Sequence, residues 1–175
     1  GETGYELVAP AGIAPALWQA LLQAGTDRGL TECGFRAIDT LRIEAGHILF
    51  MNELARPVTP FEIGLARLVD FHGTPCAGVA ALRGIRWRAP ERILSGLLPD
   101  ADSGRAAGSS AAGRPDAQIT STCVSPVLGR RIALGFVAAA DRHPGTRVRL
   151  ASGNAATVAR LPFYDPARHL ARRSA

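Results

Sequence analysis

The carboxylate of Glu6, in the opening segment GETGYELVAP, is the first side chain in the sequence that could do chemistry. An ionised carboxylate accepts two parallel hydrogen bonds from a planar partner with adjacent N–H donors, as it does from an arginine side chain. Tyr5 and Leu7 alternate with Glu6, which predicts a short strand over residues 5–9 that ends at Pro10. The pattern alone therefore favours a solvent-facing Glu6 on one face of this strand.

A second group of charged residues lies in the segment FRAIDTLRIEAG. Arg36, Asp39 and Arg42 follow one another at three-residue intervals, and Glu44 comes shortly after them. In a helix, such i,i+3 pairs stabilise by about 0.2–0.5 kcal/mol each. A salt-bridged helix face is sufficient to explain Asp39, Arg42 and Glu44.

Motifs for several other chemistries are absent from the sequence. It contains no GxGxxG, P-loop, GxSxG or HExxH pattern, so nucleotide-binding, hydrolase and zincin hypotheses have no motif to support them. The remaining candidate side chains are isolated histidines and cysteines without disulfide or zinc-ligand spacing, namely His47, His72, His143, His169, Cys33, Cys76 and Cys123. We therefore expect no metal site.

The composition predicts a folded protein in a reducing compartment. The chain has 175 residues, of which 47% are hydrophobic, enough to bury the core of one ordinary or two small domains. All 20 basic residues are arginine, which excludes a Schiff-base lysine, and the net charge is +5. The arginines are scattered with few aromatic residues between them, so we expect no nucleic-acid partner. No apolar run or signal segment points to a membrane, so the predicted location is cytoplasmic.

The first part of the chain is predominantly helical in pattern. Apolar side chains recur at three- and four-residue spacing in residues 13–24 and 35–45, which predicts two amphipathic helices that stop at Gly25 and Gly46. Thr59 and Glu62 form a capping-box pattern for one short turn, and residues 65–71 are typical of a strand. Glycine, proline and arginine are concentrated in residues 70–90, so we place the boundary between two domains, 1–85 and 86–175, in this stretch.

The second part of the chain is predominantly strand-like in pattern. Residues 92–98, 118–124, 132–138, 147–151 and 155–161 are short β-type runs, most of them separated by turn residues. Residues 100–116 contain mainly alanine, glycine, serine and aspartate without periodicity, which predicts a mobile loop. Several short strands in succession predict a small antiparallel barrel or sandwich, and the fold class is α+β.

Five sequence blocks, taken in order, resemble one enzyme family. The blocks are GETGYELVAP, CGFRAIDTLRIEAG, NELARPVTPFEIGLARLVDF, TSTCVSPVLGRRIALGFV and ARLPFYDP. They resemble the second half of the T-protein (aminomethyltransferase) of the glycine cleavage system and its folate-dependent demethylase relatives. The resemblance implies the end of a folate-binding α+β layered domain followed by a C-terminal antiparallel β-barrel. Because the chain starts inside a motif without a methionine, we expect a fragment or one half of a larger assembly.

The resemblance also implies a ligand, tetrahydrofolate, and a reaction of the intact enzyme, the transfer of a one-carbon unit from an aminomethyl donor to that folate. Glu6 would accept the paired N–H groups of the pterin. Arg36 would line the folate site and contact the pterin carbonyl, a folate carboxylate or Glu6. Arg168, just after LPFYDP, would return toward the ligand. The expected catalytic aspartate belongs to the first half, so we expect no catalytic residue and no turnover in this chain alone. Expected partners are folate and a lipoyl carrier protein or the missing N-terminal half.

Two alternatives stay open at this point. The sequence PFYDP resembles the corresponding segment of the sarcosine and dimethylglycine demethylases, so the chain could be the folate-binding module of such a flavin-dependent enzyme. A non-catalytic folate-fold protein, such as an iron-sulfur assembly factor, would carry a KGC motif, which a chain without lysine lacks. In either half-enzyme hypothesis we expect an exposed apolar surface near Glu6 and Arg36, because the first part of the layered domain is missing.

Overall fold

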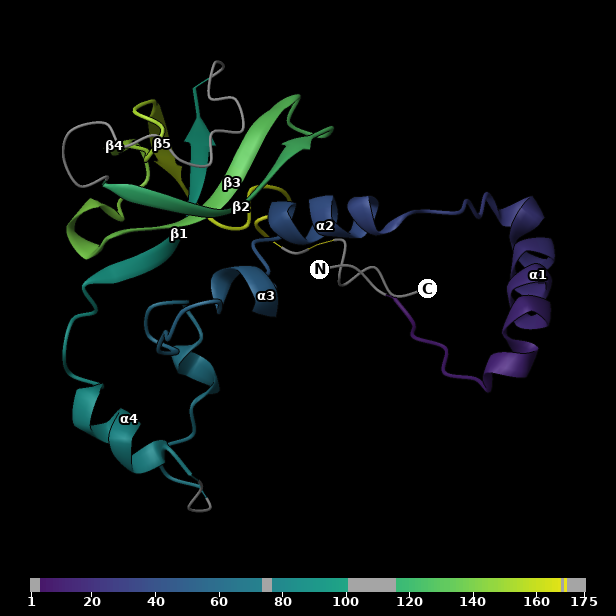
Figure 1. Cartoon of the computed structure of the whole chain (residues 1–175), viewed down its shortest axis with the longest axis horizontal. Helices are drawn as coiled ribbons and strands as arrows, with labels where there is room; N and C mark the ends of the chain where they lie inside the picture. The colour runs from purple at the N-terminus through teal and green to yellow at the C-terminus, as the bar shows by residue number, and fades with distance from the viewer. Residues whose placement is uncertain (1–3, 74–76, 101–115, 168, 170–175) are drawn as a thin grey trace.

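The second part of the chain folds into a five-stranded antiparallel sheet (Figure 1). The structure is a computed structural model and describes residues 4–73, 77–100, 116–167 and 169. The strands are β1 (Arg92–Pro99), β2 (Ala117–Ser125), β3 (Arg130–Ala138), β4 (Arg147–Arg149) and β5 (Ala155–Ala159). They lie in the order β2-β3-β1-β5-β4, and every neighbouring pair is antiparallel. The five strands predicted in this part of the sequence are confirmed.

The two outer strands of this sheet meet and close it into a small barrel. Ala117 in β2 forms a bridge with Leu150, which directly follows β4. Beside the bridge, the Asp116 N–H donates to the Arg149 carbonyl at 3.1 Å, and the Asp116 carboxylate accepts from the Arg149 N–H at 3.0 Å. A closed sheet satisfies backbone groups that an open edge would leave unpaired. The α+β fold class with a C-terminal antiparallel barrel is confirmed.

The central strands β1 and β3 are covered on both faces. Inside the barrel, Leu97, Ala133 and Val137 pack in one buried cluster with residues of β2, β4 and β5. On the outer face, Leu94 and Leu134 belong to a second cluster that also contains Ile43 from the helical part. A strand buried on both faces needs a nearly continuous apolar run, and the sequence IALGFVA in β3 supplies one.

The helical part precedes the barrel along the chain. Its elements are the short 3₁₀ turns η1 (Ala11–Ile13), η2 (Thr26–Arg28) and η3 (Ala66–Leu68), and the helices α1 (Ala14–Gly25), α2 (Phe35–Glu44), α3 (Phe50–Glu53) and α4 (Val79–Ile85). A further 3₁₀ turn, η4 (Ala139–Asp141), follows β3. The predicted helices at residues 13–24 and 35–45 are confirmed as α1 and α2. Gly46 adopts a positive φ of 71° after α2, where a side chain would be strained, which explains why this helix stops there.

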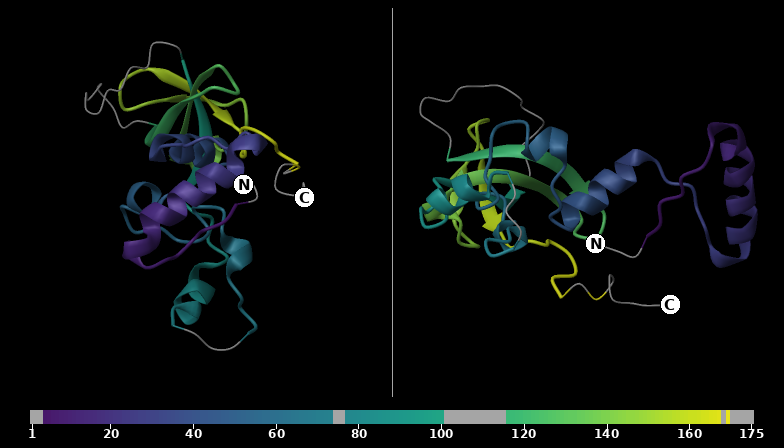
Figure 2. Two further views of the ribbon diagram at one scale, coloured as in Figure 1. Left: turned by 90° about the vertical axis from the view of Figure 1, so that its right-hand side faces the viewer. Right: turned by 90° about the horizontal axis from the view of Figure 1, so that it is seen from below.

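Helix α2 packs on the barrel, whereas α1 stands apart from it (Figure 1; Figure 2, right). An extended segment connects the end of α1, through η2, to α2, and another extended segment precedes η1 and α1 (Figure 1). The large apolar residues Trp18 and Leu21 of α1 are 49% and 38% exposed, and Val8 in the preceding segment is 98% exposed. The expectation of an exposed apolar surface in the first part of the chain is therefore confirmed.

Two predicted strands are absent from the described residues. Residues 5–9 are extended but do not pair with any strand, because no neighbouring strand lies within reach to supply ladder hydrogen bonds. Residues 65–71 contain η3 instead of a strand. There the Leu65 N–H bonds back to the Pro60 carbonyl at 2.9 Å, which continues a series of turns. The predicted loop at 100–116 lies almost entirely outside the described residues.

Candidate functional site

Glu6 lies in the extended segment before η1, and its side chain is exposed. Within the described part of the chain it takes part in no hydrogen bond or ion pair, so both carboxylate oxygens are available to an external donor. An exposed carboxylate without a partner among the described residues is compatible with binding an external ligand.

Arg36 is the second residue of α2, and it is also exposed. The backbone turns into the helix at Gly34, which has an extended conformation, and the first helical turn follows at once. The structure records no contact between Arg36 and Glu6, nor the ion pair with Asp39 that the spacing suggested, among the residues it describes. Arg168 lies outside the described residues.

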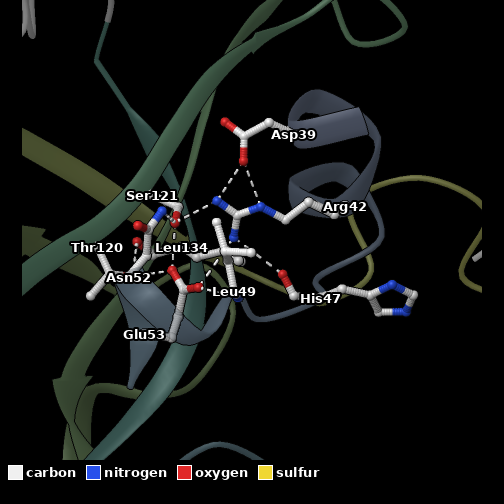
Figure 3. Close-up of polar contacts among 9 residues, drawn as sticks. All are labelled: Asp39, Arg42, His47, Leu49, Asn52, Glu53, Thr120, Ser121 and Leu134. Atoms are coloured by element: carbon white, nitrogen blue, oxygen red, sulfur yellow. Dashed lines mark hydrogen bonds and ion pairs between the residues drawn. The ribbon is translucent and has the colours of Figure 1, made fainter. Parts of the chain in front are cut away.

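The polar residues that the structure does bring together form a cluster between α2, α3 and β2 (Figure 3). At its centre is Glu53, whose side chain is 0% exposed. Four groups donate to its carboxylate. Oε1 accepts from the hydroxyls of Thr120 at 2.6 Å and Ser121 at 2.5 Å, and Oε2 accepts from the Leu49 N–H at 2.7 Å and Arg42 Nη1 at 3.1 Å. We call this set, with Asp39 and Asn52, the Glu53 cluster.

Arg42 connects the Glu53 cluster to helix α2. Its guanidinium donates to Asp39 Oδ1 at 2.7 Å, to the Ser121 hydroxyl at 2.8 Å and to the His47 carbonyl at 3.3 Å, in addition to Glu53. The arginine side chain is only 11% exposed. Asp39 and Arg42 form the predicted i,i+3 pair, and Arg42 in addition turns inward to Glu53, a contact that the helix pattern did not predict.

A β-bulge in β2 supplies the two hydroxyls. The register of β2 against β3 shifts between Ile119 and Ser121, so Thr120 is an extra residue. In a regular strand, consecutive side chains point to opposite faces, and Thr120 and Ser121 could not both reach one carboxylate oxygen. The bulge removes this restriction and turns both hydroxyls toward Glu53.

A second buried carboxylate lies at the end of α2. Glu44 is 2% exposed, and the Ser125 hydroxyl donates to its Oε1. The same hydroxyl accepts from the Leu128 N–H at 3.0 Å, so Glu44 is tied to the turn between β2 and β3. The prediction of a salt-bridged surface role for Glu44 was therefore wrong. Burial, and to a smaller extent the negative charges of Glu44 and Asp39, raise the pKa of the Cys123 thiol to about 11.

A hollow of about 270 Å³ borders the Glu53 cluster. Arg56, Arg92 and Gln118 are among the residues that line it. Arg92 pairs with Glu62 at 3.1 Å and lies over the Phe136 ring at 4.8 Å, so much of its charge is already used within the protein. Among the described residues, no group of three or more His, Cys, Asp or Glu side chains could hold a metal ion.

None of the described helices is both long enough and apolar enough to cross a membrane.

The candidate residues lie in two places. Glu6 and Arg36 are exposed on the helical part, and the Glu53 cluster is buried between the helical part and the barrel. Sequence reasoning missed the Glu53 cluster, since Glu53 and Ser121 are separated by 68 residues and no local motif links them.

Comparison with known proteins gives matches along nearly the whole chain. The family model "GCVT N-terminal domain" matches residues 1–73, and the model "Glycine cleavage T-protein C-terminal barrel domain" matches residues 94–165. Two similar curated proteins are named aminomethyltransferase. The one from Streptomyces avermitilis is 39% identical and the one from Streptomyces coelicolor is 41% identical, each over 94% of this chain and 47% of the relative.

A solved structure has the same fold as this chain. The glycine cleavage system aminomethyltransferase T from Bartonella henselae superposes with a TM-score of 0.71 at 26% identity, over 89% of this chain and 45% of that one. The chain thus spans about half the length of the curated relatives and of the solved structure that it matches.

Proposed function

Since the chain belongs to the glycine cleavage T-protein family, we propose that it is the folate-binding second half of an aminomethyltransferase. The complete enzyme would transfer a one-carbon unit from an aminomethyl donor to tetrahydrofolate. The observation that carries this proposal is the presence of both family domains, in family order, at residues 1–73 and 94–165. The names of the similar curated proteins favour a transferase over the demethylase alternative.

In this proposal, Glu6 holds the pterin ring of tetrahydrofolate. The pterin presents an N–H and an amino group side by side, which a carboxylate can accept as a pair of charge-assisted hydrogen bonds. The carboxylate of Glu6 is exposed and has no partner in the part of the chain that the structure describes, so it is available for this role. Arg36, exposed in the first turn of α2, would contact the pterin carbonyl, a folate carboxylate or Glu6 with its planar donor fork.

The residues of this chain would bind and orient the folate and would not move the reacting proton. When bound, tetrahydrofolate supplies the nitrogen that receives the one-carbon unit. Holding two reactants in the correct orientation accounts for a large part of the rate in such a transfer. The acidic group expected near the folate nitrogens, an aspartate, would come from the first half of the enzyme.

We further propose that the partners are folate and either a lipoyl carrier protein or the N-terminal half of the enzyme, in the cytoplasm. The boundary between the two domains would lie at residues 85 and 86. Arg168, which follows LPFYDP in the sequence, would return toward the ligand. The largely exposed apolar residues of α1 and the segment before it support a contact with a further polypeptide surface.

Calorimetric titration with tetrahydrofolate tests the proposed function. The wild-type chain and the variants Glu6→Gln, Arg36→Gln and Glu32→Gln are compared, with Glu32 as a control because it is likewise an exposed glutamate of the helical part. We expect Glu6→Gln to lose about 1.5 kcal/mol of binding free energy, since a charge-assisted pair becomes a mismatched amide. Glu32→Gln should bind as wild type. Equal affinity of Glu6→Gln and wild type would refute the assignment of Glu6.

A further inference from the structure

Glu53 is a fully buried carboxylate that the proposed folate site does not use. Burying a charge is costly unless it is paired and fully hydrogen-bonded, and Glu53 meets that condition with four donors from three segments of the chain. An apolar side chain would fill the same space more simply. The buried charge therefore indicates that the fold needs directional hydrogen bonds at this position, which an apolar side chain could not form.

The bonds of the Glu53 cluster determine how α2 lies on the barrel. Arg42 extends from α2 into the cluster, and Glu44 anchors the same helix to Ser125 at the other end of β2. Two anchors in the last turn of a helix fix its rotation about its own axis. The bulge at Thr120 specifies the register on the barrel side, because only this arrangement directs both β2 hydroxyls to Glu53 Oε1.

The opposite end of α2 carries the exposed side chains. Arg36 lies six residues before Arg42, a distance of about 9 Å along a helix, and Phe35 and Ile38 beside it are 70% and 57% exposed. The segment that bears Glu6 connects to the barrel through this same end of α2 (Figure 1). A rotation or tilt of α2 at its anchored end would therefore displace Arg36 and everything before it.

We infer that Glu53 is a positioning residue for the folate site, an inference that depends on the proposed function. Through Arg42, and with the two hydroxyls of the β2 bulge, it fixes the orientation of α2 on the barrel. In this way the barrel determines where Arg36 meets the ligand, although the barrel residues of the Glu53 cluster do not themselves contact the ligand.

Substitutions at Thr120 and Thr122 separate positioning from stability. Thr120→Val removes the hydroxyl that donates to Glu53 while the volume of the side chain stays nearly constant. Thr120→Ser keeps this hydroxyl. Thr122→Val is the matched control, since Thr122 lies on the same strand and donates to the Ile132 carbonyl just as Thr120 donates to the Leu134 carbonyl, but it does not contact Glu53. Glu53→Gln tests the charge directly, and Thr120→Val keeps the test available if Glu53→Gln does not fold.

Two quantities are measured for each variant at a temperature where it is fully folded, namely tetrahydrofolate affinity by calorimetry and amide hydrogen exchange of α2. We expect Thr120→Val and Glu53→Gln to weaken binding by about fivefold or more, the value of one lost hydrogen bond, and to accelerate exchange in α2. Thr120→Ser and Thr122→Val should leave both quantities unchanged.

The outcomes distinguish this inference from the proposed function. If Glu6→Gln weakens binding but folded Thr120→Val and Glu53→Gln bind as wild type, the positioning role is refuted and the proposed function stands. If the wild-type chain does not bind tetrahydrofolate even with the N-terminal half of the enzyme present, the proposed function fails and the inference that depends on it falls with it. If Thr122→Val weakens binding as much as Thr120→Val, the effect is general to β2 and the role of Glu53 is refuted.

Discussion

The substitution Arg42→Met should destabilise the protein strongly, although it keeps an unbranched, flexible side chain at this position. It removes the only cationic partner that the structure shows for the carboxylate of Glu53, together with hydrogen bonds to Asp39 and Ser121. Because the Glu53 side chain is 0% exposed, water cannot replace the lost donor. Removing one partner of a buried ion pair typically costs about 3–5 kcal/mol. Against a typical unfolding free energy of about 5–15 kcal/mol, this is a large fraction of the total.

Urea unfolding followed by far-ultraviolet circular dichroism measures this change. The double variant Arg42→Met with Glu53→Met should recover part of the loss, because an apolar pair of similar volume no longer leaves a buried charge unpaired. Arg147→Met is the matched control, since Arg147 pairs with Asp100 at 2.6 Å but both side chains are about half exposed. It should show no measurable change. An Arg42→Met variant within about 1 kcal/mol of wild type would refute the reasoning.

Three further predictions concern the residues Gly135, Cys123 and Glu62. A Cβ at Gly135 would lie 2.6 Å from a backbone oxygen of β2, so Gly135→Ala should lower the unfolding free energy by about 1–3 kcal/mol in the same urea assay. Burial raises the pKa of Cys123 to about 11, so peptide mapping after iodoacetamide treatment at pH 8.5 should show slower alkylation of Cys123 than of exposed Cys33. Burial raises the pKa of Glu62, but hydrogen bonds from its turn and from Arg92 outweigh this effect and hold the pKa below its ordinary value. The stability that Glu62 contributes is therefore present above its unfolded pKa and lost as the pH falls through its folded pKa, so Glu62→Gln should show a smaller loss of unfolding free energy in acid.

The barrel could be predicted from sequence because its strands carry local signals. Alternating or continuous apolar runs, separated by turn residues such as Gly129 and Gly145, define each strand without knowledge of its neighbours. Gly129 and Gly145 both adopt positive φ values, as turn glycines should. Helix α2 was equally predictable from its periodicity and from Gly46. In each of these cases the residues that specify the element lie within it or in the turn directly beside it.

The strand predicted at residues 5–9 shows the limit of local patterns. Tyr5 and Leu7 alternate with Glu6 as strand residues do, yet a strand exists only where another strand supplies its hydrogen bonds. The pattern records a preference for extended backbone, and the segment is indeed extended. Tyr5 is 91% exposed, so the partner that would turn this preference into a sheet is not among the described residues.

The Glu53 cluster could not be predicted because its members are specified by different parts of the chain. Arg42 and Glu53 belong to the region that matches the first family domain, and Thr120 and Ser121 belong to the region that matches the second. The predicted boundary at residues 85 and 86 separates these pairs, yet the hydrogen bonds of the cluster cross it. The residues that sequence reasoning selected, Glu6 and Arg36, lie in recognisable motifs, and the ligand contact proposed for each would constrain the type of a single side chain. A buried network constrains several side chains jointly, and each member alone has an ordinary sequence context. In the positioning role that we infer for Glu53, the orientation of the helix that carries Arg36 is therefore encoded on the barrel, in Ser121 and in Thr120, the extra residue of β2.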